Sequence, residues 1–268
     1  MTDASIEASR KIRELSLRLV HKANASHIGS ALSIADLLAV LVTSPEICNL
    51  PAPQDPARDR LLLSKGHACV ALYSALCTKG FFSESELMTY GDDFSPFMNH
   101  ASHHVPGIEI STGALGHALS IGCGKAIAAR AKKEDWHTFA ILSDGEMQEG
   151  SNWESLMFAS YHSLSNLTVI IDYNNLQSLA SVDKTLSISP LDEKLSSFGW
   201  HVFHVDGHTH DELYSVLAQA KVESNPAAII MHTTKGKGVS FMENSVEWHY
   251  RSPNSAQLDQ AIAEVYSQ

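Results

Sequence analysis

Four short apolar runs in the second half of the chain constrain its fold most. The runs occupy residues 137–142, 167–172, 200–205 and 227–232. Helical patterns lie between them, at residues 150–162, 191–197 and 210–222. Continuous apolar strands that alternate with helices indicate a parallel sheet with helices on both faces. We therefore predict an α/β fold in which residues 1–268 form a single domain.

The first half of the chain is mostly helical in pattern. Apolar residues at helical spacing predict an amphipathic helix over residues 5–23, and further helices fit residues 33–43, 68–79 and 115–133. Residues 91–113 differ, because they are rich in Gly, Pro, His and Ser. We expect them to form a long functional loop.

Charge and cysteine content exclude several classes of partner. The net charge is −11, from 19 Lys and Arg against 30 Asp and Glu, and such a surface repels nucleic acid and anionic membranes. No apolar run reaches transmembrane length, and the N-terminus lacks an apolar signal core. The four cysteines form no CxxC pair, which favours reduced thiols. We expect a cytoplasmic protein with no nucleic-acid or membrane partner.

Polar residues at the ends of two consecutive strands predict a metal site. Asp144 follows the run 137–142, and Asn174 follows the run 167–172. Ligands in an open parallel sheet lie beyond the carboxyl ends of the strands, so these side chains can converge. With the backbone carbonyl of Leu176, they supply about half of an octahedral Mg²⁺ shell, and phosphates usually supply most of the rest. Gly145 lets a phosphate approach the backbone at a helix N-terminus.

The segment SDGEMQEG, followed one strand–helix–strand unit later by Asn174 and Asn175, resembles the thiamine diphosphate motif GDG…NN. Ser143 stands where that motif has its first glycine. The resemblance implies that the chain binds thiamine diphosphate and Mg²⁺, with Ca²⁺ or Mn²⁺ able to substitute for Mg²⁺. The alternative is that Asp144 only caps a helix.

Four further segments resemble the transketolase family, in the family's order. They are ANASHIGSALS (23–33), RDRLLLSKGHA (58–68), NHASHHVPGIEISTGALGHALS (99–120) and TTKGKGVSFMENSVEWHYRSP (233–253). With the metal motif they cover nearly the whole chain, so the chain resembles the N-terminal, diphosphate-binding domain of a transketolase. Ile28 and His117 depart from the family, which often has Pro and Gln at these positions.

The resemblance implies roles for the matching histidines. His67 and His249 would contact the cofactor diphosphate. His27, His100 and His249 would act on the substrate, bonding its hydroxyls and relaying protons, a task that suits histidine near neutral pH. Each histidine taken singly has a structural alternative, such as a buried ring bonded to backbone.

The resemblance also implies roles outside the histidines. The backbone of Gly113, Ala114 and Leu115 would lie against the aminopyrimidine ring, while Gly145 and Asn174 would help to hold the cofactor. Glu149 matches an acidic residue at the family's subunit interface, although a carboxylate that favours the start of a helix is an equal alternative. The segment KGKG (235–238) lacks the spacing of a nucleotide-binding loop. We expect it to close on the cofactor, with Lys235 or Lys237 facing phosphate.

Transketolases transfer a two-carbon ketol group from a ketose phosphate to an aldose phosphate. In the full-length enzymes, the glutamate that activates the cofactor belongs to a pyrimidine-binding domain that follows this region. The chain ends at Gln268, before such a domain. The resemblance therefore implies a C-terminal partner subunit that supplies the domain and the glutamate, with two pairs forming a heterotetramer.

Three other functions remain open from the sequence. The alpha subunit of a keto-acid dehydrogenase or decarboxylase shares the metal motif. A synthase of deoxyxylulose phosphate is a further relation, although it is normally one long chain. A non-catalytic protein could keep the fold and lose the cofactor, and Ser143, Ile28 and His117 are the substitutions that would accompany such a loss.

Overall fold

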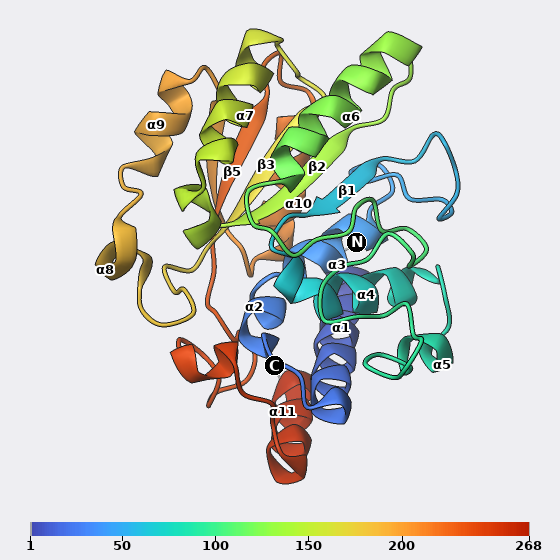
Figure 1. Ribbon diagram of the computed structural model, residues 1–268. Coiled ribbons are helices and arrows are strands. Elements are labelled where there is room, and N and C mark those ends of the chain that lie inside the picture. Colours follow the sequence, from blue (N-terminus) through green and yellow to red (C-terminus); the bar gives the residue numbers. More distant parts are fainter. Residues whose placement is uncertain (1, 268) are drawn as a thin grey trace.

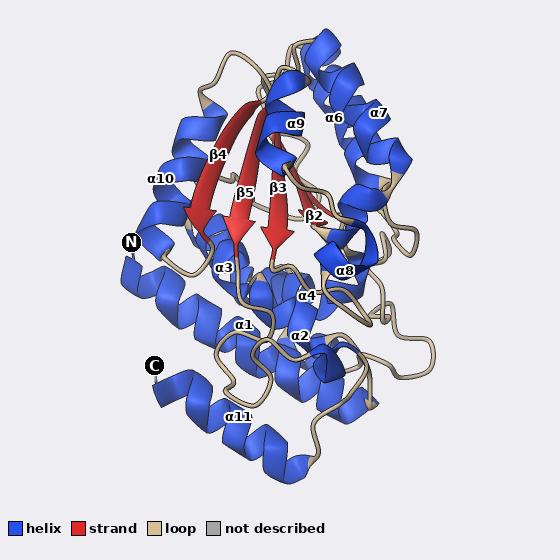
Figure 2. Ribbon diagram, turned by 90° about the vertical axis from the view of Figure 1, so that its left-hand side faces the viewer, coloured by secondary structure: helices blue, strands red, loops and turns tan. Residues whose placement is uncertain are grey.

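A parallel sheet forms the centre of the protein, as a computed structural model that describes residues 2–267 shows (Figures 1 and 2). Its strand order is β1-β2-β3-β5-β4, and every neighbouring pair is parallel. The predicted α/β fold is thus confirmed. The strands are β1 (Arg60–Leu63), β2 (Thr138–Ser143), β3 (Leu167–Tyr173), β4 (His201–Asp206) and β5 (Ala227–His232).

Helices cover both faces of the sheet (Figure 2). One face packs against α1, α3, α4 and α10, and the other packs against α6, α7 and α9. The helices are α1 (Thr2–Ala23), α2 (Ile28–Ser33), α3 (Ala35–Thr43), α4 (Cys69–Lys79), α5 (Glu84–Leu87), α6 (Ala118–Lys132), α7 (Gly150–Tyr161), α8 (Val182–Leu186), α9 (Leu191–Ser197), α10 (His210–Lys221) and α11 (Ser255–Ser267). Short 3₁₀ turns are η1 (Gly66–Ala68), η2 (Gly145–Gln148) and η3 (Val246–His249).

Successive strand side chains enter two different hydrophobic cores, as the pleat of a strand requires. On β2, Phe139 and Ile141 pack in the core with α1, α3 and α4, while Ala140 and Leu142 pack with α6 and α7. All four are fully buried, and each large one contributes about 1.5–3 kcal/mol of burial free energy. This double burial explains why the strand reads as one continuous apolar run.

The strand at the end of the sheet departs from this pattern. On β4, the side chains of His201, His204 and Asp206 are exposed. Helices cover both faces of the sheet, but β4 is covered less completely than the other strands. As an edge strand, β4 has a single neighbouring strand, and the helices beside it cover it only in part.

Most predicted elements are present with small shifts at their ends. The strands β2 to β5 and the helices α1, α3, α4, α6, α7, α9 and α10 all match predicted segments. The described residues 91–113 contain neither helix nor strand. The sequence pattern did not reveal β1 or α11. Within residues 2–267, no helix combines the length and the apolar character that a membrane span requires.

Four strands end at the same edge of the sheet and deliver polar residues there. Ser64 follows β1, Asp144 follows β2, Asn174 follows β3 and Thr233 follows β5. Because the strands are parallel, their carboxyl ends lie side by side. Segments far apart in sequence therefore meet at this edge.

Candidate active site

A cavity of about 370 Å³ opens at the carboxyl edge of the sheet. Almost all of the predicted site residues line it. These are His27, His67, His100, Gly113, Leu115, Asp144, Gly145, Asn174, Leu176 and His249. Ala114 is not among the lining residues. Glu149 lies at the cavity as an exposed side chain.

The four predicted histidines meet on one side of this cavity. The ring centroid of His27 lies 5.2 Å from that of His67, 4.9 Å from that of His249 and 6.2 Å from that of His100. The backbone N–H of His27 donates to the carbonyl of His249 over 2.8 Å. Residues from four distant segments thus form one cluster, and its members contact one another.

His27 carries two signs of a functional position. Its φ of 75° lies in the left-handed region, which non-glycine residues rarely adopt, and such conformations cluster at functional sites. Its Nδ1 atom is buried and has no hydrogen-bond partner within the described chain. Leaving a buried polar atom unpaired costs about 1–3 kcal/mol. A bound ligand is the natural source of the missing partner.

Burial keeps all four histidines uncharged at neutral pH. Burial and the positive charge of Lys235, with a neighbouring histidine, lower the pKa of His27 to about 4 and that of His249 to about 3. Burial also holds the pKa of His67 well below its usual range and lowers that of His100. A neutral imidazole has one donor and one acceptor nitrogen. The cluster can therefore bond hydroxyl groups in both directions.

The loop after His100 is held close to the turn that carries His67. A Cβ atom on Gly66 would lie only 1.9 Å from Oγ1 of Thr112, so the two segments can touch only because residue 66 is glycine. Thr112 in turn donates its backbone N–H to the carbonyl of Ala101 over 2.9 Å. This contact fixes the loop at the point where Gly113 enters the cavity wall.

Asp144 occupies the position expected of a metal ligand. Its Oδ1 accepts the backbone N–H of Gly145 over 2.7 Å, and its Oδ2 accepts the backbone N–H of Asn175. Burial, and then the carboxylate of Asp172, raise the pKa of Asp144 to about 6. A divalent cation would favour the charged form of this crowded carboxylate. The bond to Gly145 also makes Asp144 the N-cap of η2. Capping this turn and binding a metal are compatible roles of the Asp144 side chain.

The other two predicted metal ligands lie in the turn after β3. Oδ1 of Asn174 accepts the backbone N–H of Leu176 over 3.0 Å, which fixes the amide so that its oxygen, and not its nitrogen, faces this turn. Both Asn174 and Leu176 line the cavity with Asp144. Carboxylate, amide and carbonyl oxygens are the ligands that Mg²⁺ and Ca²⁺ prefer. The donor set therefore fits a hard divalent cation.

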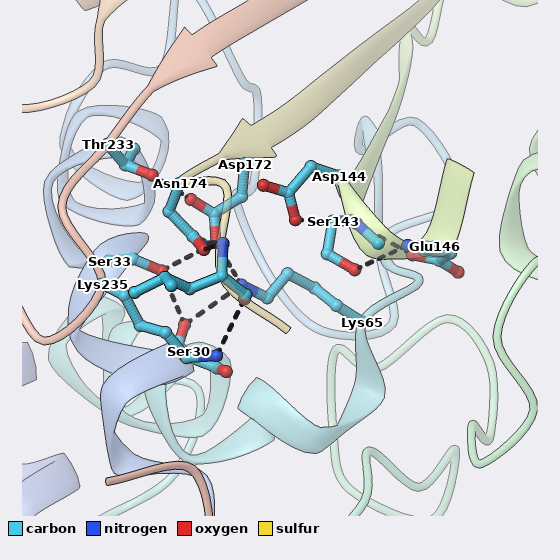
Figure 3. A network of polar contacts seen from close by, with 12 residues as sticks. Ser30, Ser33, Lys65, Ser143, Asp144, Glu146, Asp172, Asn174, Thr233 and Lys235 are labelled. Atoms are coloured by element: carbon cyan, nitrogen blue, oxygen red, sulfur yellow. Dashed lines mark hydrogen bonds and ion pairs between the residues drawn. The ribbon is translucent and has the colours of Figure 1, made fainter. Parts of the chain in front are cut away.

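A buried ion pair lies below the cavity, and the sequence did not reveal it. The ammonium group of Lys65 pairs with the carboxylate of Asp172, and both side chains are fully buried. Asp172 also accepts the hydroxyl hydrogens of Ser33, over 2.7 Å, and of Thr233 (Figure 3). Lys65 donates in addition to the carbonyl of Ser30 over 3.2 Å. The signal available in the sequence was Asp172, a charged residue within the apolar run that precedes Asn174.

A second buried lysine, Lys235, reaches the cavity from the KGKG segment. Its Nζ donates to the carbonyls of Leu176, over 3.0 Å, and of Gln177, over 3.2 Å, and lies 3.2 Å from Nδ1 of His249. Burial and the charge of Lys65 lower its pKa to about 8, so it remains mostly protonated at pH 7. Lys235 thus places positive charge where an anionic ligand would enter, whereas the charge of Lys65 is paired with Asp172.

The two lysines of the KGKG segment point to different places. Lys235 lines the cavity, whereas the ammonium group of Lys237 lies 3.9 Å from the carboxylate of Glu243. Of the two predicted candidates, Lys235 is therefore the one that faces the site.

A buried glutamate joins three segments of the cavity wall and explains Ser143. Oε1 of Glu146 accepts the backbone N–H of Gly116 over 2.7 Å and the hydroxyl hydrogen of Ser64. Its Oε2 accepts the N–H of Ser143 over 3.2 Å, while the hydroxyl of Ser143 accepts the N–H of Glu146 over 3.3 Å (Figure 3). This reciprocal pair has the hydrogen-bond pattern of a capping box, displaced by one residue from Asp144, the N-cap of η2. Ser143, which departs from the motif, therefore contributes a bond that glycine cannot.

Comparisons with known proteins show the family of the chain. Residues 4–264 match the family model described as "Transketolase, thiamine diphosphate binding domain". The chain is 38% identical over 258 residues to a subunit of the apulose-4-phosphate transketolase of Phocaeicola vulgatus, covering 96% of this chain and 92% of that protein. It is 36% identical over 256 residues to the 6-deoxy-6-sulfo-D-fructose transketolase subunit SqwG of a Clostridium species, covering 95% of this chain and 93% of that protein.

A solved transketolase has the same fold. The crystal structure of transketolase from Campylobacter jejuni superposes with a TM-score of 0.92 at 30% sequence identity, covering 98% of this chain. The chain spans 43% of the length of that transketolase. The similarity in sequence and in structure therefore concerns the same part of the enzyme.

Proposed function

Because the chain belongs to the transketolase family, we propose that it is the thiamine diphosphate- and Mg²⁺-binding subunit of a two-subunit transketolase. The reaction transfers a two-carbon ketol group from a ketose phosphate to an aldose phosphate. The observation that carries the proposal is the meeting of four neutral histidines, Asp144 and two buried lysines at one cavity. Residues 1–268 act in this proposal as one diphosphate-binding domain.

Three oxygen donors hold the metal in this proposal. They are the carboxylate of Asp144, the amide oxygen of Asn174 and the carbonyl oxygen of Leu176, all at the same cavity. Diphosphate oxygens complete the shell, as is usual for Mg²⁺. Ca²⁺ or Mn²⁺ would also accept this all-oxygen donor set.

Lys235 supplies the positive charge for the diphosphate, while the charge of Lys65 beside it is paired with Asp172. Both ammonium groups are buried, and charge-assisted bonds are strongest where water is excluded. His67 and Gly145 border the same space. Together these groups would bind a dianionic ligand while the acidic surface of the chain repels other anions.

When bound, thiamine diphosphate supplies the carbanion chemistry that breaks and forms the carbon–carbon bond. The chain's own residues position the sugar and move protons. His27, His100 and His249 are neutral at pH 7, so each can donate to one donor-ketose hydroxyl and accept from another. The ring of His27, whose Nδ1 has no partner within the described chain, lies beside the rings of His67 and His249.

A partner subunit completes the site in this proposal. Among the described residues that line the cavity, the lysine and arginine side chains are those of Lys65 and Lys235. Lys65 is paired with Asp172, and this proposal assigns Lys235 to the diphosphate. The distal phosphate of a sugar phosphate therefore needs cations from another chain. The cofactor ring likewise needs an activating carboxylate from that chain. We place the partner against the exposed Glu149. In this proposal two such pairs form a heterotetramer in the cytosol, a reducing compartment in which the four free cysteines would stay reduced.

Calorimetric titration tests the binding half of the proposal. Thiamine diphosphate is titrated into the chain with its partner subunit, with and without Mg²⁺. Binding should require Mg²⁺ and should be lost in Asp144→Ala, while the exposed Asp135→Ala serves as the matched control and should bind like the wild type. Metal-independent binding, or no binding, would instead support a non-catalytic protein that has kept only the fold.

A further inference from the structure

A buried carboxylate outside the cavity collects four hydrogen bonds. Asp36 on α3 is 4% exposed. It accepts two bonds from the guanidinium of Arg13, over 2.8 and 2.6 Å, one from Nδ1 of His208 over 2.8 Å and one from Nε2 of His210 over 3.2 Å. Burial acts to raise the pKa of Asp36, but Arg13 and the two histidines hold it well below its usual range. Asp36 is therefore ionised.

The charge on Asp36 determines which nitrogen of His208 carries the hydrogen. An ionised carboxylate only accepts hydrogen bonds, so Nδ1 of His208 must donate to it. In a neutral ring, Nε2 is then an acceptor. The backbone N–H of Thr234 donates to that Nε2 over 2.8 Å. Asp36 thus acts on Thr234 through the orientation and tautomer of one imidazole.

Arg13 connects the same carboxylate to the other side of Lys235. Its Nε donates to the backbone carbonyl of Lys237 over 3.1 Å. Through His208 and Arg13, Asp36 is therefore linked to the loop backbone at Thr234 and at Lys237, on either side of residues 235 and 236. Neither His208 nor Arg13 lines the cofactor cavity; both border a second cavity beside α1 and α10.

The segment between these two anchors has little freedom. Gly236 adopts a φ of 82°, and a Cβ atom there would lie 2.3 Å from the carbonyl oxygen of Met242. The N–H of Gly236 donates to the carbonyl of Gly29 over 3.0 Å. Lys235 therefore projects from a fixed backbone, and its ammonium group reaches Leu176 over 3.0 Å.

We propose that His208, oriented by Asp36, is a positioning residue that holds the loop backbone at Thr234 and thereby aims Lys235 at the cofactor diphosphate. The inference rests on the proposed function, because it takes the diphosphate as the ligand of Lys235. His208 itself touches neither cofactor nor substrate; its effect passes through the N–H of Thr234.

The chain offers a matched control in His210. This ring also bonds Asp36, but its other nitrogen lies 2.8 Å from the hydroxyl of Ser5 on α1 and not against the loop. His208→Asn keeps a donor for Asp36 and removes the acceptor for Thr234. His210→Asn disturbs the same carboxylate without removing a loop contact. A folding effect should be common to both variants, whereas a positioning effect should be confined to His208.

The experiment measures the dissociation constant of thiamine diphosphate, with Mg²⁺ and the partner subunit present, together with the melting temperature of each variant without cofactor. His208→Asn should weaken binding by about tenfold, the consequence of losing one buried acceptor, while His210→Asn should change it less than twofold. In a Lys235→Met background, His208→Asn should have almost no further effect on binding. His208→Gln, whose side-chain oxygen can reach the place of Nε2, should restore part of the affinity.

Three results would overturn the inference: unchanged binding in His208→Asn, an equal loss in His210→Asn, or a full loss from His208→Asn when Lys235 is already Met. If His208→Asn does not fold, His208→Gln replaces it in the test. His208→Gln should then bind thiamine diphosphate more tightly than Lys235→Met does. Failure of the wild-type complex to bind thiamine diphosphate is a separate outcome, which contradicts the proposed function itself.

Discussion

The ammonium nitrogen of Lys235 lies 3.0 Å from the carbonyl oxygen of Leu176, which is the oxygen that the sequence predicts as a metal ligand. Lys235 thus donates to the backbone atom that we propose as a ligand of the divalent cation. Charge-assisted bonds to phosphate are stronger than bonds to a neutral carbonyl. We therefore expect Lys235 to turn from Leu176 to the diphosphate when cofactor and metal bind together.

Replacing this lysine should weaken cofactor binding selectively. Lys235→Met should raise the dissociation constant of thiamine diphosphate by about 10- to 100-fold, the range expected for losing one hydrogen bond to a charged group. Calorimetry on the complex with Mg²⁺ measures it. Lys237→Met is the control, since its ammonium group lies 3.9 Å from Glu243 and away from the cavity. Equal losses in the two variants would contradict the assignment.

The reciprocal hydrogen bonds between Ser143 and Glu146 should contribute to stability. Glu146→Gln replaces an acceptor oxygen with an amide nitrogen and leaves a buried N–H unpaired, at a cost of about 1–3 kcal/mol in the free energy of unfolding. Ser143→Gly should cost less, because it removes a single bond. Urea denaturation measures both. The exposed capping box of Ser83 and Glu86 offers a control, and an effect of Glu86→Gln as large as that of Glu146→Gln would refute this explanation.

His27 should affect turnover more than cofactor binding. Asparagine tolerates the left-handed backbone that His27 adopts, so His27→Asn should fold. It should lower kcat by about 100-fold or more, the usual contribution of a proton-transferring side chain. Thiamine diphosphate affinity should change little, because Nδ1 has no partner to lose within the described chain. The exposed His103→Asn should keep full activity, and a normal kcat in His27→Asn would exclude the proposed role.

Acid should destabilise the chain in part through His137. Burial, and then the charge of Lys221, lower the pKa of this ring to about 3, whereas in the unfolded chain it titrates near 6.5. Between these values the unfolded state binds one more proton, so the free energy of unfolding falls as the pH falls from about 6.5 to 3, by about 1.4 kcal/mol per pH unit. His137→Gln keeps a partner for Thr168 and should remove this share of the slope. Identical slopes in urea titrations of wild type and variant would contradict it.

The sequence predicts those elements whose burial produces a regular local pattern of apolar residues. The continuous apolar run of β3 and the helical spacing of α1 follow from burial against one or two cores, and both segments were predicted within a few residues. The strand β1 was missed because its four residues, Arg60–Leu63, are too short to show a period. Asp144 and Asn174 were predictable because parallel strands bring their ends together.

The parts of the site that were missed depend on contacts between distant segments. Lys65 and Asp172 form a buried pair although 107 residues separate them. The charge of Asp172 stands out in its apolar run, but nothing in the local sequence identifies Lys65 as its partner. Ser143 could be recognised as a departure from the motif, but its bonds to Glu146 are visible only in the folded chain. The network of Asp36 and His208 is likewise invisible in sequence, since it joins α3 to the turn before α10.

Ketol transfer by the reconstituted complex is the decisive measurement. The purified chain is mixed with its partner subunit, Mg²⁺ and thiamine diphosphate, and transfer from ketose phosphates to aldose phosphates is followed. We predict transfer only in the complete mixture, with none from this chain alone and none when Asp144→Ala replaces the wild type. A complete mixture that binds the cofactor but transfers no ketol group from any ketose, or that turns over pyruvate instead, would contradict the assignment.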